Sequence, residues 1–101
     1  MLSFLAVFKT HKKETSPGLN SFCISGTSIA IDLPNKKNDK TIKLLKDLEK
    51  SVLKFKGKIN PSKDSIMSAK TYKKSYPNWI KLNKFKDPYL SSSFWERVTK
   101  K

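Results

Sequence analysis

The run Lys63-Asp64-Ser65-Ile66-Met67-Ser68 holds the residues whose types and order are best suited to chemistry. It is followed by Tyr72, Tyr76-Pro77, Trp79 and Asp87-Pro88. A lysine ammonium that is held in place can stabilise negative charge that develops during a reaction. By composition alone, however, the run is one more lysine-rich stretch, and a solvated side chain is the default interpretation of any single lysine. The ordered pattern is what makes Lys63 a candidate site residue.

The sequence lacks the common motifs of a self-contained enzyme. No GxGxxG or GxxxxGK[ST] pattern is present, and the whole chain has three glycines. There is no GxSxG or HExxH motif, and no pair of carboxylates has a convincing acid/base spacing. Cys23 and the surface-loop residue His11 each stand alone, so neither an internal disulfide nor a metal site is expected. A single cysteine fits a reducing compartment, and we expect a cytoplasmic protein.

The net charge of +14 first suggests an anionic partner, either nucleic acid or a membrane surface. Of the 22 basic residues, however, only Arg97 is arginine. Specific readers of phosphate and guanine depend on the bidentate guanidinium group, which lysine lacks. We therefore treat most of the charge as background and expect no specific nucleic acid partner. The alternative, a small lysine-rich nucleic-acid-binding protein, rests on the tyrosines and tryptophans interleaved among the lysines.

The chain has the length of one domain. Its hydrophobic pattern predicts the strands and helices that must position Lys63–Ser68. Apolar Leu2–Lys9 predicts a buried strand covered on both faces, and is too short to span a membrane. Lys12–Asn20 predicts a solvated loop. Further extended segments are expected at 21–25, 28–33 and 59–67. The elements together predict an α+β fold.

An amphipathic helix is expected at 41–55, with Asn38 or Asp39 as its cap and Gly57 as its terminator. Its leucine face should pack on the core and its lysine face should be solvated, although a membrane-surface helix would show the same pattern. Three shorter helices should follow. Ser68 caps the first, Pro77 begins the second and the serines at 91–93 cap the last, with Trp79 and Trp95 as core or interface anchors.

The stretch Gly57–Ala69 resembles the "GG-R-x-Y-x-A-K-D-S-x-M-S/T-A" segment of FAD-linked oxidoreductases of the vanillyl-alcohol-oxidase superfamily. The branch it resembles most contains the decaprenylphosphoryl-ribose oxidases, with sugar-lactone oxidases more distant. Other stretches resemble that family's sequences in the same order, with Ser3–Lys9 and Pro17–Pro34 upstream and Tyr76-Pro77, Asp87-Pro88 and Ser92–Val98 downstream. The resemblance therefore extends over nearly the whole chain.

The resemblance implies that residues 1–101 are one C-terminal segment of the substrate (cap) domain. In that domain, short antiparallel strands lie with a packed amphipathic helix and a helical C-terminal tail. FAD would be bound mainly by an N-terminal domain that is missing from this chain, so an upstream polypeptide is the expected partner. The implied reaction is oxidation of an alcohol carbon of a sugar or sugar derivative, and the chain alone should not catalyse it.

By the same resemblance, Lys63 corresponds to the lysine that approaches both the flavin and the bound sugar, and so is expected to act in catalysis, substrate binding and cofactor binding. Hydride transfer to a flavin builds negative charge that a fixed ammonium would stabilise. Asn60 corresponds to a tyrosine beside the substrate, and Ala30 to a cysteine, so the chain departs from the pattern of that branch at both positions. Asn60 is either a ligand of a sugar hydroxyl or a turn residue before Pro61.

Overall fold

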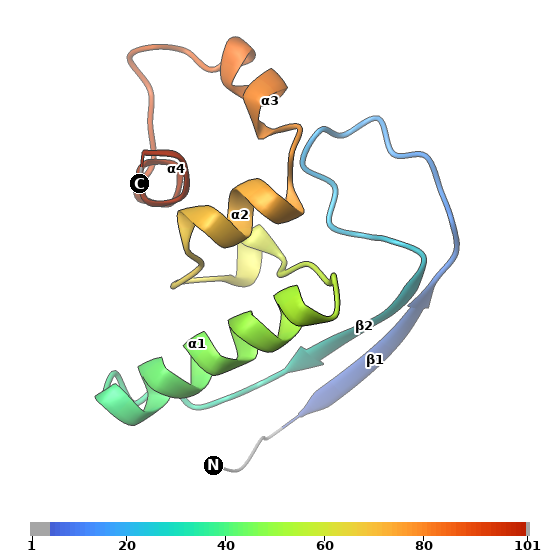
Figure 1. Ribbon diagram of the computed structural model, residues 1–101, viewed down its shortest axis with the longest axis vertical. Helices are drawn as coiled ribbons and strands as arrows, with labels where there is room; N and C mark the ends of the chain where they lie inside the picture. The colour runs from blue at the N-terminus through green and yellow to red at the C-terminus, as the bar shows by residue number, and fades with distance from the viewer. Residues whose placement is uncertain (1–4, 101) are drawn as a thin grey trace.

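A computed structural model describes residues 5–100 and shows an α+β fold, as predicted (Figure 1). Two strands come first, followed by four α-helices and one short 3₁₀ helix. In chain order the elements are β1 (Ala6–His11), β2 (Gly26–Ile31), α1 (Asp39–Lys54), η1 (Pro61–Lys63), α2 (Ala69–Ser75), α3 (Trp79–Phe85) and α4 (Ser93–Thr99). The helices α2, α3 and α4 gather on one side of the molecule, whereas the sheet lies on the other side of α1 (Figure 1).

The sheet has two antiparallel strands in the described part of the chain, with Ala6 opposite Ile31 and His11 opposite Gly26. The predicted strand at 2–9 is therefore shifted toward the C-terminus, and its first residues lie outside the described range. His11 ends β1 instead of lying in a loop, and its Nε2 is 2.7 Å from the Ser28 hydroxyl. The predicted extended segments at 21–25 and 59–67 are wrong as strands, because neither segment has a ladder partner among residues 5–100; the second contains η1 instead.

The predicted cap Asn38 is confirmed, because its side chain accepts a hydrogen bond from the N–H of Thr41 at 2.9 Å, and α1 begins two residues before the predicted start at 41. Its end differs from the prediction by one residue. Lys56 takes the left-handed conformation (φ 57°), and the N–H groups of Lys56 and Gly57 close the helix on the carbonyls of Leu53 and Val52. This is a Schellman motif with lysine at the position that usually holds glycine. Gly57 is needed for space instead, since a Cβ there would lie 3.1 Å from a Val52 methyl.

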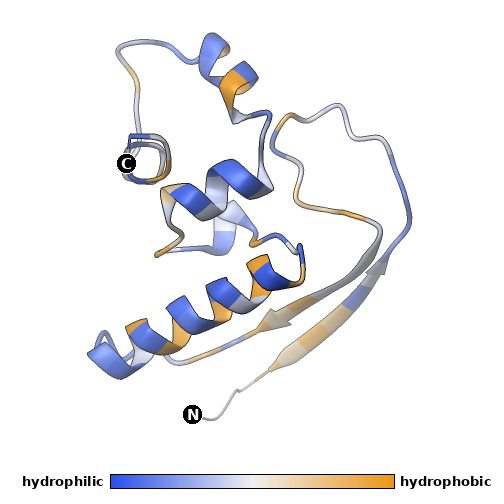
Figure 2. Cartoon of the chain, viewed as in Figure 1, coloured by the Kyte–Doolittle hydropathy of each residue, from blue (hydrophilic) through white to orange (hydrophobic). Residues whose placement is uncertain are grey.

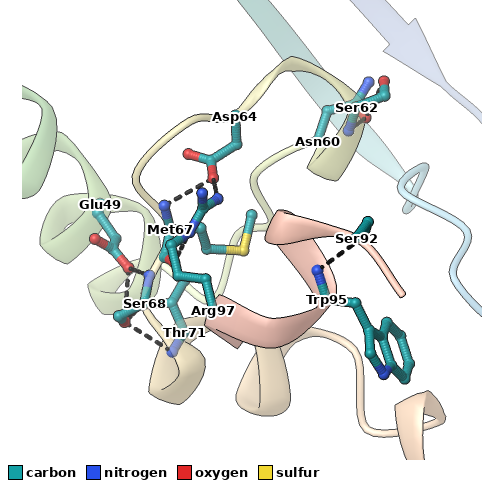
Figure 3. A network of polar contacts seen from close by, with 10 residues as sticks. All are labelled: Glu49, Asn60, Ser62, Asp64, Met67, Ser68, Thr71, Ser92, Trp95 and Arg97. Atoms are coloured by element: carbon teal, nitrogen blue, oxygen red, sulfur yellow. Dashed lines mark hydrogen bonds and ion pairs between the residues drawn. The ribbon is translucent and has the colours of Figure 1, made fainter. Parts of the chain in front are cut away.

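The serine caps predicted for the C-terminal helices are confirmed. The Ser68 hydroxyl accepts a hydrogen bond from the N–H of Thr71 at 3.2 Å and begins α2. In the same way the Ser92 hydroxyl accepts from the N–H of Trp95 at 3.1 Å and begins α4 (Figure 3). Helix α3 ends at Phe85, just before Asp87-Pro88, but Pro77 precedes its first turn by two residues.

The hydrophobic core lies between α2 and α4. Its centre consists of Met67, Tyr72, Tyr76 and Val98, which are at most 2% exposed. The ring of Tyr72 stacks on that of Tyr76 at 5.4 Å and meets those of Phe94 and Trp95 edge-on. Trp79 and Trp95 are partly buried against this cluster, which confirms their predicted role as anchors.

The sheet and the leucine face of α1 are much less buried than predicted. Phe8 in β1 is 68% exposed, and in α1 only Thr41 and Glu49 are buried. Ile42 and Leu48 are 38% and 41% exposed, whereas Leu44, Leu45, Val52 and Leu53 are half-buried, so the predicted leucine face is only partly packed. Figure 2 shows these apolar stretches of α1 and of both strands in orange. The physical reason is that, within residues 5–100, other elements cover only part of the sheet and part of the leucine face.

We expect Lys56→Gly to stabilise the purified chain by about 0.5 kcal/mol, because glycine relieves the left-handed strain at the end of α1 and only part of this gain is offset by its greater entropy when unfolded. Urea unfolding followed by circular dichroism measures the change. The adjacent change Gly57→Ala is the matched control, because it alters a neighbouring residue without relieving the left-handed conformation of Lys56, and its Cβ would lie 3.1 Å from a Val52 methyl. An unchanged or lowered midpoint for Lys56→Gly would contradict the strained conformation.

Candidate functional site

The Lys63–Ser68 loop, which joins η1 to α2, is held by the side chain of Asp64. One carboxylate oxygen of Asp64 accepts two hydrogen bonds, from the N–H of Met67 at 2.7 Å and from Nη2 of Arg97 at 2.9 Å (Figure 3). The Asp64 side chain is only 7% exposed. A carboxylate in this position is stabilised by its charged partner and its backbone donor together, so the residue after Lys63 is fixed to the protein.

Arg97 connects this loop to α4 with two different nitrogens. While Nη2 contacts Asp64, Nε donates to the carbonyl of Met67 at 3.2 Å (Figure 3). The planar guanidinium group can make both contacts at once, which the ammonium of a lysine cannot do. Arg97 also lies over the ring of Phe94, 5.6 Å from its centroid. The one arginine of the chain therefore has a structural position that none of its lysines could fill equally well.

Glu49 holds the other end of the loop to α1. Its carboxylate accepts hydrogen bonds from the N–H and the hydroxyl of Ser68, at 2.9 and 2.8 Å (Figure 3). The Ser68 hydroxyl also contacts the hydroxyl of Thr71 at 3.0 Å. This cluster joins α1 to the start of α2 through polar contacts, where the sequence predicted leucine packing.

The pKa of Glu49 is set by two opposing effects. Burial alone would raise the pKa of this carboxyl, but hydrogen bonds from Thr71 and Ser68, with a contribution from the charge of Lys46, bring it below its ordinary value. The charged form is therefore the one that the fold stabilises. For Tyr72 and Tyr76, burial dominates and raises the pKa of both phenols. Both are neutral hydrogen-bond donors in the core, to Asn20 and to the carbonyl of Ile59.

The two site residues predicted from the sequence lie close together at the start of the loop. Lys63 ends η1 with an exposed side chain. Asn60 caps η1, and its side-chain oxygen accepts hydrogen bonds from the N–H and the hydroxyl of Ser62 at 3.1 and 2.9 Å (Figure 3). The structure thus gives Asn60 a role in the turn before Pro61, and its part in substrate binding stays a prediction, as does that of Lys63.

Hollows in the surface lie elsewhere. One, of about 460 Å³, is lined by β2, residues 22–25 and the end of α1. Another, of about 350 Å³, lies between α3 and α4 and is lined by Leu82, Phe85, Leu90 and Trp95. Lys63 lines neither of them. Within residues 5–100, no group of three His, Cys, Asp or Glu side chains is placed to hold a metal ion. No helix in this range is both long and apolar enough to cross a membrane.

Two residues of this network were not identified from the sequence. Glu49 falls on the same side of the predicted α1 helix as Leu45 and Leu53, and a carboxylate within an apolar face is a signal for a buried hydrogen-bonding role. Arg97 is the only arginine of the sequence, but its partner Asp64 lies 33 residues earlier in the chain. No periodicity or local motif predicts a pairing over that distance.

The chain is a distant homologue of an oxidase. It is 34% identical over 89 residues to the decaprenylphosphoryl-beta-D-ribose oxidase of Mycolicibacterium smegmatis, and the match covers 85% of this chain. The chain spans about a fifth of that relative's length, since the matched region is 19% of the oxidase. No protein-family model matches the chain. The similarity supports the oxidase resemblance seen in the sequence, and leaves the position within a longer protein and the substrate as predictions.

We expect Arg97→Lys to lower the free energy of unfolding by about 1–2 kcal/mol, because an ammonium cannot contact Asp64 and Met67 together, and Arg97→Leu to lower it by about 3 kcal/mol, because Asp64 is left buried without its cation. Thermal and urea unfolding of the purified chain measure both changes. The control is Lys100→Ala, which breaks the exposed Lys100–Glu96 pair on the same helix and should cost less than about 0.5 kcal/mol. Equal effects of all three changes would show that the paired contact of Arg97 with Asp64 and the Met67 carbonyl does not stabilise the fold.

Glu49 should make the free energy of unfolding depend on pH in the acidic range. Its pKa is lowered from an ordinary value of 4.5 by folding, so its contribution is fully present above pH 4.5 and is lost as the pH falls through the lower folded-state pKa. Glu49→Gln should be less stable than the wild type at pH 7, and the difference should shrink as the pH falls below 4.5. Urea midpoints measured across this range test the expectation. A difference that stays constant with pH would show that the charge of Glu49 is not what stabilises the fold.

Proposed function

We propose that the chain is the C-terminal substrate-domain portion of an FAD-dependent oxidoreductase that oxidises an alcohol carbon of a sugar or sugar derivative. The observation that carries the proposal is the 34% identity to an oxidase of a ribose derivative over most of this chain. The matched region is a small part of that oxidase, so the activity would belong to a longer assembly. The chain by itself would not be catalytic.

The structure supports a role for Lys63 through the way its loop is held. Asp64 is fixed by Arg97 and Met67, and the cap of η1 fixes Asn60 on the other side of Lys63. The carboxylate next to Lys63 in sequence is thus engaged by Arg97, and the ammonium of Lys63 lies on the surface. A fixed backbone carrying an exposed cation is suited to present positive charge to a bound group.

FAD fits this chain only as a group that is held mainly by another polypeptide. Lys63 provides an exposed ammonium, which suits the edge of a flavin where negative charge collects, but it lines neither of the two hollows described above. A bound flavin would supply the acceptor for the hydride of the alcohol. Lys63 would stabilise the resulting charge and help to orient the sugar, and Asn60 would contribute its side-chain amide to a sugar hydroxyl while its oxygen keeps the turn.

The partner in this proposal is the FAD-binding domain or upstream polypeptide, and the second ligand is a sugar-type small molecule. The compartment that we propose is the cytoplasm, because the chain has a single cysteine, Cys23, which is free and exposed.

The competing function is nucleic acid binding, which the net charge of +14 favours. The structure weakens the argument from aromatic residues. Tyr72 and Tyr76 are buried, and the rings of Tyr76 and Trp79 are each covered by a lysine, Lys58 and Lys73. Of the three tyrosines only Tyr89, at 93% exposure, is open for stacking on a base. Micromolar or tighter binding that survives physiological salt would favour this second function.

The proposal is tested by producing the chain together with the polypeptide encoded upstream of Met1 and measuring flavin absorbance and alcohol oxidation. Lys63→Ala should lower turnover by about 100-fold in the assembled protein, as the loss of one charge-stabilising group commonly does. Stability of the chain should not change, because the Lys63 side chain is exposed.

Lys70→Ala is the matched control, since Lys70 is an exposed lysine on the neighbouring helix α2, and it should leave turnover unchanged. Absence of flavin from the assembled protein would contradict the proposed function itself. Bound flavin with normal turnover of Lys63→Ala would contradict the role of Lys63 alone.

A further inference from the structure

One face of the two-stranded sheet is exposed and carries no charge. Side chains alternate between the faces of a strand, so the register places three directly opposed pairs on this outer sheet face. The pairs are Ala6–Ile31, Phe8–Ile29 and Thr10–Thr27. All six residues are exposed, including Phe8 at 68%, Ile29 at 55% and Ile31 at 48%. An uncharged surface is notable in a chain whose residues are 30% charged.

The opposite face of the sheet is the more polar and the better covered one. It carries the pairs Val7–Ala30, Lys9–Ser28 and His11–Gly26. Val7, His11 and Ser28 are partly buried, the other three residues are exposed, and His11 bonds to Ser28. The usual arrangement of a half-buried sheet, with the apolar face inward and the polar face in water, is therefore reversed. A two-stranded sheet is also marginal in water unless another strand or layer packs on it. The sheet is thus unlike the aromatic core, which is complete within this chain.

From this geometry we infer that the outer sheet face and the free edge of β1 are the docking surface for the polypeptide that carries the flavin, which adds a strand to β1 and covers Phe8, Ile29 and Ile31. This inference rests on the proposed function. Each strand pairs along one edge only in the described chain, so β1 offers backbone groups to a further strand. The counterpart of this chain in the relative is a fifth of a longer protein, which provides the length for such a layer.

The net charge of the chain favours one kind of partner at the outer sheet face over a second copy of the chain. A second copy would bring another +14 charges to the same interface, and this repulsion opposes pairing of two identical sheets. A partner with an uncharged, apolar contact surface and a net negative charge around it would meet no such cost. The occupant that we assign is therefore an acidic polypeptide with an apolar contact strand.

The experiment measures the affinity of the purified chain for the flavin-loaded upstream polypeptide by calorimetry, in moderate salt. Ile29→Lys and Ile29→Glu should each weaken binding by at least tenfold, because a charge of either sign must then be buried in an apolar contact. Comparing the two variants separates the cost of burying a charge from long-range electrostatic attraction. If attraction alone were changed, one variant would bind more tightly and the other more weakly than the wild type. Amide exchange in β1 should slow on binding, as strand addition would protect its N–H groups.

Phe85→Lys and Phe85→Glu are the matched controls, since Phe85 is 82% exposed on α3, and both should bind like the wild type. Unfolding midpoints of the free variants show that each chain still folds. If the wild type binds the flavoprotein but both Ile29 variants bind equally well, the inference is overturned and the proposed function stands. If the wild type does not bind it, the proposed function fails as well. A dimer of the chain alone that Ile29→Glu dissociates would overturn the inference in favour of a second copy.

Discussion

The Asp64 carboxylate is the contact on which the arrangement of the C-terminal half depends. It is almost fully buried and accepts from the backbone of its own loop and from Arg97 of the last helix. Loss of either donor would leave a buried charge poorly satisfied, which is among the most costly defects that a small fold can contain. The loop that carries Lys63 and the helix that closes the aromatic core are therefore fixed by one group.

Stability is distributed unevenly over this chain. The aromatic rings between α2 and α4 form a closed core, and the tyrosine hydroxyls of that core reach out to residues 20 and 59. The sheet and the leucine face of α1 have no comparable cover within the described residues, and α1 is joined to α2 mainly through Glu49. One half thus has a closed core, and the other half leaves apolar side chains exposed.

Local features of the fold could be predicted because they depend on few adjacent residues. The caps by Asn38, Ser68 and Ser92 each need one side chain and an N–H three residues later, and all three are present. The strands are harder to predict from the sequence. Residues 21–25 and 59–67 have the composition of strands but find no partner, and pairing is a property of two segments. At the candidate site the motif predicts Lys63 and Asn60, but it does not predict the Asp64–Arg97 and Glu49–Ser68 contacts that hold the loop after Lys63.

The sequence by itself determined the α+β class, the capped starts of α1, α2 and α4 and the candidate lysine, since periodicity, capping and motif order all depend on local residue spacing. Only the tertiary structure decided which apolar faces are covered. The pattern of α1 predicts an apolar face but cannot say whether anything packs on it, because burial depends on the neighbours that folding brings near. The same distinction applies to the position of Lys63. Its place in a motif is local, but its fixed and exposed position depends on a carboxylate and an arginine 33 residues apart, which only the folded chain brings together.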